Sequence, residues 1–267
     1  MKKYWSFFRL RFVMGLQYRT AAAAGMVTQF VWGFMECFAF QAFYETNPAA
    51  FPMEFSAMVA YIWLQQAFLA MFMAWMMEND IFEMIVSGNI AYELCRPVSI
   101  YQMWFARTIA TRVSRALLRC IPILAVAFLL PKPYGMTLPA DLGTFLAFAG
   151  TMVLGLLVAA ASCLLVYVLA FFTISGQGLR IFMVSLVEFL SGAIIPLPFL
   201  PQPFRTVAQC LPFASMQNVP LRIYGGDLAG RDMGYAVLLQ VFWLVFLVLL
   251  GKGLCRRAER RIVVQGG

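Results

Sequence analysis

The most regular feature of the sequence is a series of long apolar stretches separated by short polar ones. Each stretch approaches or exceeds the ~20 residues that a helix needs to cross the apolar core of a bilayer. Backbone polar groups must be paired inside lipid, and a strand-like alternation is absent, so we predict helices throughout. The stretches are residues 21–44, 55–77, 99–130, 142–172, 181–197 and 233–254. The pattern predicts an all-α, polytopic membrane protein with six transmembrane helices.

The amino-acid composition agrees with this pattern. Hydrophobic residues make up 63% of the chain and charged residues only 12%, whereas soluble domains carry about 25% charged residues. The stretches between the predicted spans are too short to hold a soluble domain. We therefore predict that residues 1–267 form a single transmembrane domain.

The first 19 residues combine basic side chains with aromatic residues at helical spacing. Arg9 and Arg11 interrupt the apolar core that a signal peptide would need, while Trp5, Phe8 and Phe12 recur on one helix face. We predict an amphipathic helix over residues 1–19 that lies in the membrane interface.

The segment over residues 198–232 is apolar but interrupted by proline. Six prolines punctuate the region from 196 to 220, so the segment is too short and too broken to span the membrane twice. We predict two short re-entrant helices that dip into the outer leaflet before the last span.

Basic residues indicate the orientation of the chain. Of the 20 Lys and Arg residues, the predicted outer loops hold only Lys132, Arg205, Arg222 and Arg231. Because basic residues accumulate on the cytoplasmic side, both termini are predicted to be cytoplasmic. This asymmetry also accounts for the net charge of +8 without a nucleic-acid partner.

Several kinds of chemistry lack their usual residues in this sequence. Histidine is absent, the six cysteines are scattered without a CxxC pair, and the nucleotide-binding pattern GxxxxGK[ST] is missing. The sequence therefore predicts no catalytic site, no metal site and no cofactor on this chain. Any ATP and Mg²⁺ would be bound by a partner.

The loop over residues 78–104 is predicted to contain two short helices. Gly88 and Asn89 separate them, and Asn89 is expected to cap a helix over residues 90–95. Pro97 disfavours helical geometry at the residue before it and so ends that helix. Ser99 is expected to start the next helix in a capping box with Gln102.

Polar residues within the predicted spans have two interpretations. They either join helices by hydrogen bonds or line a translocation pathway, and the sequence leaves both open. The uncharged or acidic members in the first two spans are Gln29, Glu36, Gln65 and Gln66. In the fourth span, Gly150 and Gly155 predict close contact between helices.

Arg112, Arg115 and Arg119 share one face of the third span. We expect Arg112 and Arg115 to reach the lipid headgroups with their long side chains. Arg119 lies deeper, at nearly the depth of Glu188 in the fifth span. A carboxylate facing lipid is costly, so we hypothesise that Glu188 pairs with an arginine of the third span.

Two stretches together resemble the permease subunits of type-2 ATP-binding-cassette (ABC) exporters, particularly an uncharacterised bacterial branch. SGNIAYELCRPVS is similar to the cytoplasmic coupling segment between the second and third spans of that family. GAIIPLPFLPQPFRTVAQCLPF, continuing to IYGGD, is similar to its outer re-entrant segment. The N-terminal interfacial helix and six spans match as well, so the resemblance covers nearly the whole chain.

The resemblance implies a permease of the bacterial plasma (inner) membrane that works with ABC ATPase subunits and a second permease, identical or related. ATP-driven closure of the ATPases would move the coupling helix and export an amphiphilic substrate. The implied coupling residues are Gly88, Asn89, Ile90, Tyr92, Glu93, Leu94, Arg96 and Pro97. The first, second and fifth spans would form the pathway, and the implied outer gate comprises Pro198, Pro201, Phe204, Leu211, Pro212 and Phe213.

Two other functions remain as alternatives. An ion- or proton-coupled secondary transporter or channel could use Glu36 or Glu188 without an ATPase, although no internal repeat supports it. A membrane enzyme would need a cluster of catalytic side chains that the sequence lacks. The loop over residues 78–104 could also be a plain connector.

Overall fold

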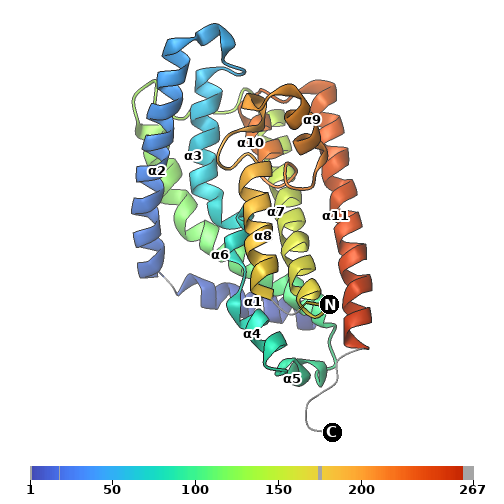
Figure 1. Ribbon diagram of the computed structural model, residues 1–267. Helices are drawn as coiled ribbons and strands as arrows, with labels where there is room; N and C mark the ends of the chain where they lie inside the picture. Colours follow the sequence, from blue (N-terminus) through green and yellow to red (C-terminus); the bar gives the residue numbers. More distant parts are fainter. Residues whose placement is uncertain (1, 18, 174–175, 261–267) are drawn as a thin grey trace.

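The computed structural model describes residues 2–17, 19–173 and 176–260, and their regular structure is entirely helical. The all-helical prediction is therefore confirmed. The long helices form a bundle, and short helices cover both of its ends (Figure 1). In chain order the α-helices are α1 (Lys2–Leu16), α2 (Arg19–Thr46), α3 (Phe55–Phe72), α4 (Asn79–Val86), α5 (Ile90–Leu94), α6 (Ile100–Leu129), α7 (Leu142–Ala170), α8 (Gly176–Leu190), α9 (Gln202–Cys210), α10 (Asn218–Tyr224) and α11 (Gly230–Glu259). Short 3₁₀ helices are η1 (Pro48–Ala50), η2 (Ala74–Met76) and η3 (Leu197–Phe199).

Four helical stretches within the described residues are long and apolar enough to cross a membrane. They are Ala22–Thr46, Phe55–Val86, Leu142–Ala170 and Gly230–Glu259. Helix α6 has 30 residues but carries four arginines, and α8 has only 15 residues. The chain is thus a multi-pass helical membrane protein, and length and composition alone support four of the six predicted spans.

Two predicted spans continue beyond the ends of the observed helices. The stretch over residues 55–77 breaks at Met73, which is extended at φ −66° and ψ 131°. The stretch over residues 181–197 is helical only as far as Leu190, and Gly192 follows with a φ of 81°. A left-handed φ is accessible mainly to glycine, so the chain leaves the span earlier than predicted. We call residues 191–229, which contain η3, α9 and α10, the outer segment after their predicted side of the membrane.

Helices α3 and α7 form the centre of the bundle. Most residues of these two helices are buried, whereas few residues of α2 and α11 are. Helix α3 packs against α2, α6 and α10, and α7 packs against α6, α8, α10 and α11. The two central helices therefore connect both flanks of the bundle.

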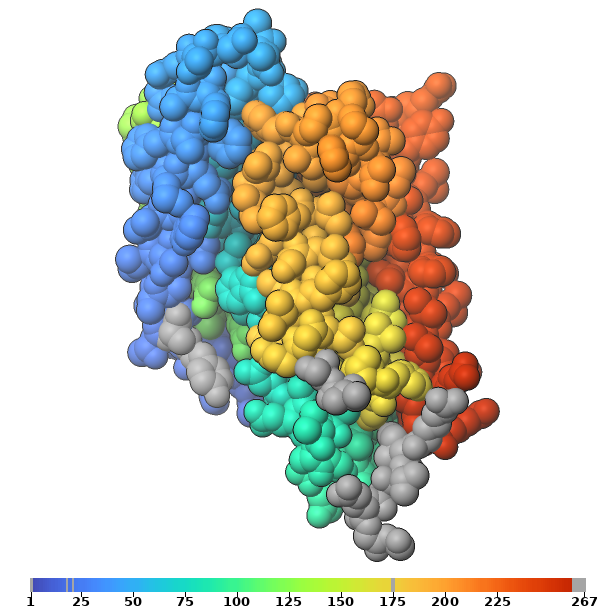
Figure 2. All heavy atoms as spheres, in the orientation of Figure 1, coloured from blue at the N-terminus to red at the C-terminus, as the bar shows by residue number. Residues whose placement is uncertain are grey.

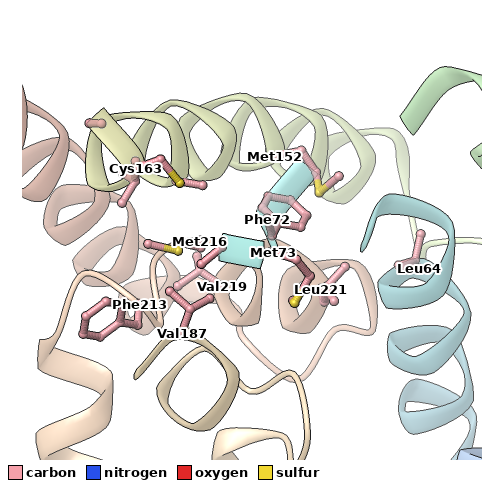
Figure 3. Packing of buried hydrophobic residues seen from close by; sticks show 14 of the residues in the cluster. Leu64, Phe72, Met73, Met152, Cys163, Val187, Phe213, Met216, Val219 and Leu221 are labelled. Atoms are coloured by element: carbon pink, nitrogen blue, oxygen red, sulfur yellow. The ribbon is translucent and has the colours of Figure 1, made fainter. Parts of the chain in front are cut away.

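The core extends from the bundle into the outer segment. Figure 3 shows Phe72 of α3, Met152 of α7 and Met216 of the outer segment within one buried cluster. Gly155 of α7 permits this approach, because a Cβ atom there would lie 2.0 Å from the carbonyl oxygen of Met216. The predicted close contact at Gly155 is confirmed. At Gly150 the prediction is wrong, because a Cβ atom would meet nothing within 4 Å.

Helix α1 lies beside the first half of α6, at the end of the bundle where α4 and α5 also lie (Figure 1). The Tyr4 hydroxyl accepts a hydrogen bond from the N–H of Ser99, just before α6 begins. A Cβ atom on Gly15 would lie 2.1 Å from the Ser114 hydroxyl oxygen. The two helices therefore run side by side for about three turns, and α1 covers the charged half of α6.

Candidate functional site

We call residues 78–99, which contain α4 and α5, the α4–α5 segment. It projects from one end of the molecule (Figure 2). Gly88, with a φ of 77°, makes the turn between the two helices. Only glycine adopts this left-handed conformation without a steric penalty, so the break predicted at this position has a local cause.

The side-chain caps predicted in this segment are wrong. Asn89 is itself helical at φ −63° and ψ −8°, and its side chain accepts no capping hydrogen bond. Ser99 precedes α6 but also forms no side-chain cap. Its N–H instead donates to the Tyr4 hydroxyl of α1 at 3.1 Å, so a tertiary contact replaces the capping box.

Apolar and polar contacts fix the α4–α5 segment to the bundle. Ile81 and Ile90 are buried against it. The indole N–H of Trp104 donates to the Glu93 carboxylate at 3.0 Å, which ties α5 to α6. The ammonium group of Lys3 donates to the carbonyl oxygen of Pro97 at 2.6 Å, which ties the segment to α1.

The first turn of α4 is held by an ion-pair cluster. Arg107 of α6 pairs with the carboxylates of both Glu78 and Asp80. Glu78 also accepts the Thr111 hydroxyl at 3.0 Å, and its own N–H donates to the Tyr167 hydroxyl of α7 at 2.7 Å. Charge-assisted hydrogen bonds are shorter and stronger than neutral ones, so this cluster joins α4, α6 and α7 firmly.

Arg11 of α1 lies beside this cluster. Its burial, and then the positive charge of Arg107, lower the pKa of Arg11, whereas Glu78, Asp80 and Glu93 raise it. An arginine starts from so high a pKa that it stays protonated at physiological pH. Arg11 therefore brings a second permanent positive charge to the same group of carboxylates.

Arg112 occupies the break between α3 and α4. Its guanidinium donates to the Met71 carbonyl at 2.8 Å and to the Cys163 sulfur at 3.0 Å, and the residue is only 2% exposed. The negative end of the α3 dipole lies at this terminus and stabilises a cation there. The expectation that Arg112 reaches the headgroups is therefore wrong, because the side chain caps a broken helix instead.

A second arginine joins α8 to the same region. Arg180 donates to the side chain of Asn79 at the start of α4 and to the Trp75 carbonyl at 3.2 Å. The 3₁₀ turn η2 also packs against α8. The α4–α5 segment thus contacts α1, α6, α7 and α8, and a displacement of the segment would reach all four helices.

Most of the residues that resemble ATPase contacts are exposed on the surface of this segment. Tyr92 is 75% exposed, and Leu94, Arg96 and Pro97 are also exposed, whereas Ile90 is buried. Val86, which the sequence did not single out, is 78% exposed at the end of α4. Glu93 points inward to Trp104 instead. The structure therefore separates the predicted coupling residues into an exposed apolar tip and an inward anchor.

The polar residues predicted within the first two spans are brought together in part. The Gln66 amide donates to the Glu36 carboxylate at 3.3 Å, linking α3 to α2. The Gln65 amide donates to the Ala193 carbonyl at 2.7 Å, beyond the end of α8. Gln29 is buried. These hydrogen bonds join elements of the bundle, which agrees with the interpretation that the polar residues connect helices.

The hypothesised pair between Glu188 and an arginine of the third span is wrong for the structure described. Within residues 2–17, 19–173 and 176–260, the salt bridges involve Arg107 and Arg222, and none includes Glu188. Arg119 lies against α2, where a Cβ atom on Gly25 would lie 2.7 Å from the guanidinium carbon. The guanidinium group of Arg115 donates to the Met76 sulfur at 3.3 Å. Because α6 packs mainly on α1, α2, α3 and α7, its arginines do not meet Glu188.

The residues of the implied outer gate divide between the interior and the surface. Pro198, Pro212 and Phe213 are buried, and Leu211 is half-buried. Pro201 and Phe204 are exposed, with Phe204 at 69%. Arg205 secures the turn before α9 by donating to the carbonyls of Pro198 and Leu200.

The contacts described for this site could transmit a movement from one helix to another. Among the described residues, no group of three or more His, Cys, Asp or Glu side chains is arranged to hold a metal ion. The α4–α5 segment presents an exposed apolar surface around Tyr92. Ion pairs and hydrogen bonds attach the same segment to several helices of the bundle.

Comparison with protein families identifies the chain as a transporter component. The family model described as ABC-2 family transporter protein matches residues 30–266. Comparisons with curated proteins and with solved structures give no match. Members of such a family are membrane components of ABC transporters and are not themselves catalytic. Since the match includes α3 to α11 and most of α2, the chain belongs to the ABC-2 transporter family.

Proposed function

We propose that this chain is the permease subunit of an ABC exporter and that the α4–α5 segment receives the movement of a separate ATPase. The observation that carries the proposal is the pairing of an exposed tip with a rigid base. Tyr92 and Val86 face solvent, while Arg107 fixes the start of the segment to the bundle. A partner that grips such a tip can move the helices behind it.

The charge distribution supports a cytoplasmic position for this segment. Lys and Arg residues concentrate on α1, the first half of α6 and the end of α11, which lie at the same end of the bundle as α4 and α5 (Figure 1). Cytoplasmic loops carry an excess of such residues. In this proposal α6 and α8 complete six spans, both termini are cytoplasmic, and the chain lies in a bacterial plasma membrane.

A second permease, identical or related, completes the transporter in this proposal. ATP and Mg²⁺ bind to the partner ATPases. The substrate is amphiphilic, because the surfaces of α2 and α8 that could face a second permease are largely apolar, with Trp32, Phe38 and Phe189 exposed. The segment from η3 to α10 closes the outer end.

The test is ATP turnover by the complex co-purified with its ATPase. Replacing both Tyr92 and Leu94 by glutamate places two charges in the proposed contact, and we expect stimulated turnover to fall about tenfold or more. The matched control is Tyr92→Phe with Leu94→Met, which preserves the apolar surface and should leave turnover nearly unchanged. Undiminished turnover in the charged variant would contradict the proposal. Proton-driven flux by this chain alone in liposomes would favour the secondary-transporter alternative.

A further inference from the structure

A second feature of the same end of the molecule is an apolar groove between α1, α6 and α11. The groove has a volume of about 580 Å³, within the range of small-molecule sites. Its walls include Trp5 and Phe8 of α1, Phe105 and Ile109 of α6, and Val248 of α11. Trp5 and Phe8 stack with their ring centroids 5.4 Å apart. The surface is suited to an acyl chain.

A polar pocket of about 430 Å³ adjoins this groove. The two cavities share Tyr101, Gln102 and Lys252, so they are neighbours along α6 and α11. The polar pocket adds Arg256 of α11 together with Glu259. The Glu259 carboxylate accepts the Cys255 thiol at 3.6 Å. The lining of the polar pocket therefore holds two cations and one carboxylate, and its excess charge is positive.

Tyr101 supplies an independent observation at the junction of the two cavities. The residue is 3% exposed, and its hydroxyl forms no hydrogen bond within the described structure. A Cβ atom on Gly251 would lie 2.8 Å from the Tyr101 ring, so α6 and α11 approach closely here. Unpaired buried hydroxyl groups are costly, and a small rotation of the Tyr101 side chain toward either cavity would let an oxygen of a bound ligand become the missing partner.

We infer that the groove between α1, α6 and α11 binds an anionic phospholipid. Its acyl chain would lie along Trp5, Phe8 and Phe105, and its phosphate would lie beside Lys252 and Arg256. Basic pockets between membrane helices bind anionic headgroups, and Trp and Tyr side chains gather at the level of the headgroups. An apolar groove adjoins a basic pocket, so the combined surface fits a molecule with an apolar chain and an anionic headgroup better than it fits a soluble anion.

The location gives the bound lipid a structural role. Leu94 at the end of α5 and Val98 also line the polar pocket, and Tyr4 of α1 lines the groove while it holds the N–H of Ser99. A lipid in this position would contact α1, α6, α11 and the end of the α4–α5 segment together. The inference concerns binding and does not depend on the partner ATPase.

The test compares phosphatidylglycerol with phosphatidylcholine of identical acyl chains. The full chain, delipidated in detergent, is mixed with either lipid, and retained lipid is measured by native mass spectrometry. We expect phosphatidylglycerol to be retained preferentially. Arg256→Ala should weaken its binding about fivefold, while Arg257→Ala, which removes an exposed neighbouring charge outside the pocket, should have little effect.

Two further variants test the same groove if Arg256→Ala is poorly folded. Glu259→Gln removes the opposing carboxylate and should increase retention of phosphatidylglycerol. Ala106→Trp fills the groove and should reduce it, whereas inorganic phosphate added in excess should not displace the lipid. Circular dichroism reports whether each variant keeps its helicity. Equal retention of the two lipids, equal losses in Arg256→Ala and Arg257→Ala, or displacement by inorganic phosphate would each overturn the inference.

Discussion

The two ends of the bundle differ in the ion pairs that join their elements. The end that holds the α4–α5 segment is called the inner end, after the proposed orientation. At the end that holds the α4–α5 segment, Arg107, Glu78 and Tyr167 satisfy one another across three helices. At the other end, the ion pair between Arg222 and Asp227 joins residues only five positions apart and links no separate long helices in the described structure.

Buried polar atoms without a hydrogen-bond partner occur at both ends, and at the inner end they include the hydroxyls of Tyr101 and Thr108. At the outer end they include the hydroxyls of Ser191 and Ser215, the Asn218 side-chain oxygen and the Gln240 side-chain oxygen.

The difference suggests different mechanical properties for the two ends. Charged and hydrogen-bonded pairs across elements resist separation, because breaking them leaves buried charge without compensation. An unpaired buried polar atom costs about 1–3 kcal/mol, and hydration on opening would recover part of that cost. We therefore expect the inner end to move as one body, and the outer segment, which lacks ion pairs between long helices in the described structure, to rearrange at lower cost.

The largest expected effect comes from removing the arginine at the inner end. Arg107→Ala leaves the Glu78 carboxylate, whose side chain is 12% exposed, without its cation. Loss of one partner of a buried pair costs about 3–5 kcal/mol. We expect the unfolding temperature of the purified protein to fall by about 10 °C, measured by tryptophan fluorescence or circular dichroism.

Asp80 provides the matched control for that variant. It also pairs with Arg107, but its side chain is 54% exposed. Exposed ion pairs contribute about 0–1 kcal/mol, so Asp80→Ala should change the unfolding temperature only slightly. Similar changes in Arg107→Ala and Asp80→Ala would mean that the inner cluster is solvated and not rigid.

A smaller effect is expected where the outer segment packs on α7. Gly155→Ala places a Cβ atom about 2 Å from the Met216 carbonyl oxygen, a backbone atom that cannot rotate away. Forced overpacking costs about 1–3 kcal/mol, so the unfolding temperature should fall by a few degrees. Gly150→Ala, in open space on the same helix, should be neutral or slightly stabilising. Equal results for the two variants would show that the outer segment is not seated on α7 by this contact.

The sequence predicted helices more successfully than the contacts between them. The apolar run and the expected start at Ser99 predict a helix over residues 99–130, close to α6, although the capping box itself does not form. Gly88 predicts the break between α4 and α5. Both features depend on local properties of the chain, namely the length of an apolar run and the accessible backbone angles. They therefore need no knowledge of neighbouring helices.

The break at Met73 and the arginine contacts could not be predicted in this way. Residues 71–77 contain neither glycine nor proline. The group that bonds the Met71 carbonyl at the break is Arg112, which lies 41 residues away along the chain. A partial signal was present for the ion-pair cluster, because the loop over residues 78–104 is rich in acidic residues and Arg107 follows directly. Which carboxylate meets which arginine depends on helix packing, and the same dependence explains the failure of the Glu188 hypothesis.

The smallest expected effect tests the outer end directly. Ser191→Ala and Ser215→Ala each remove a buried hydroxyl that has no partner in the described structure, so each should raise stability by up to about 1 kcal/mol, or about 2 °C. Ser162→Ala is the control, because this equally buried hydroxyl donates to the Val158 carbonyl at 2.9 Å and its loss should lower stability by a similar amount. If all three variants are destabilised alike, the outer hydroxyls have partners such as bound water. Hydration on opening would then recover no cost in the outer segment, and one reason to expect that segment to rearrange would be lost.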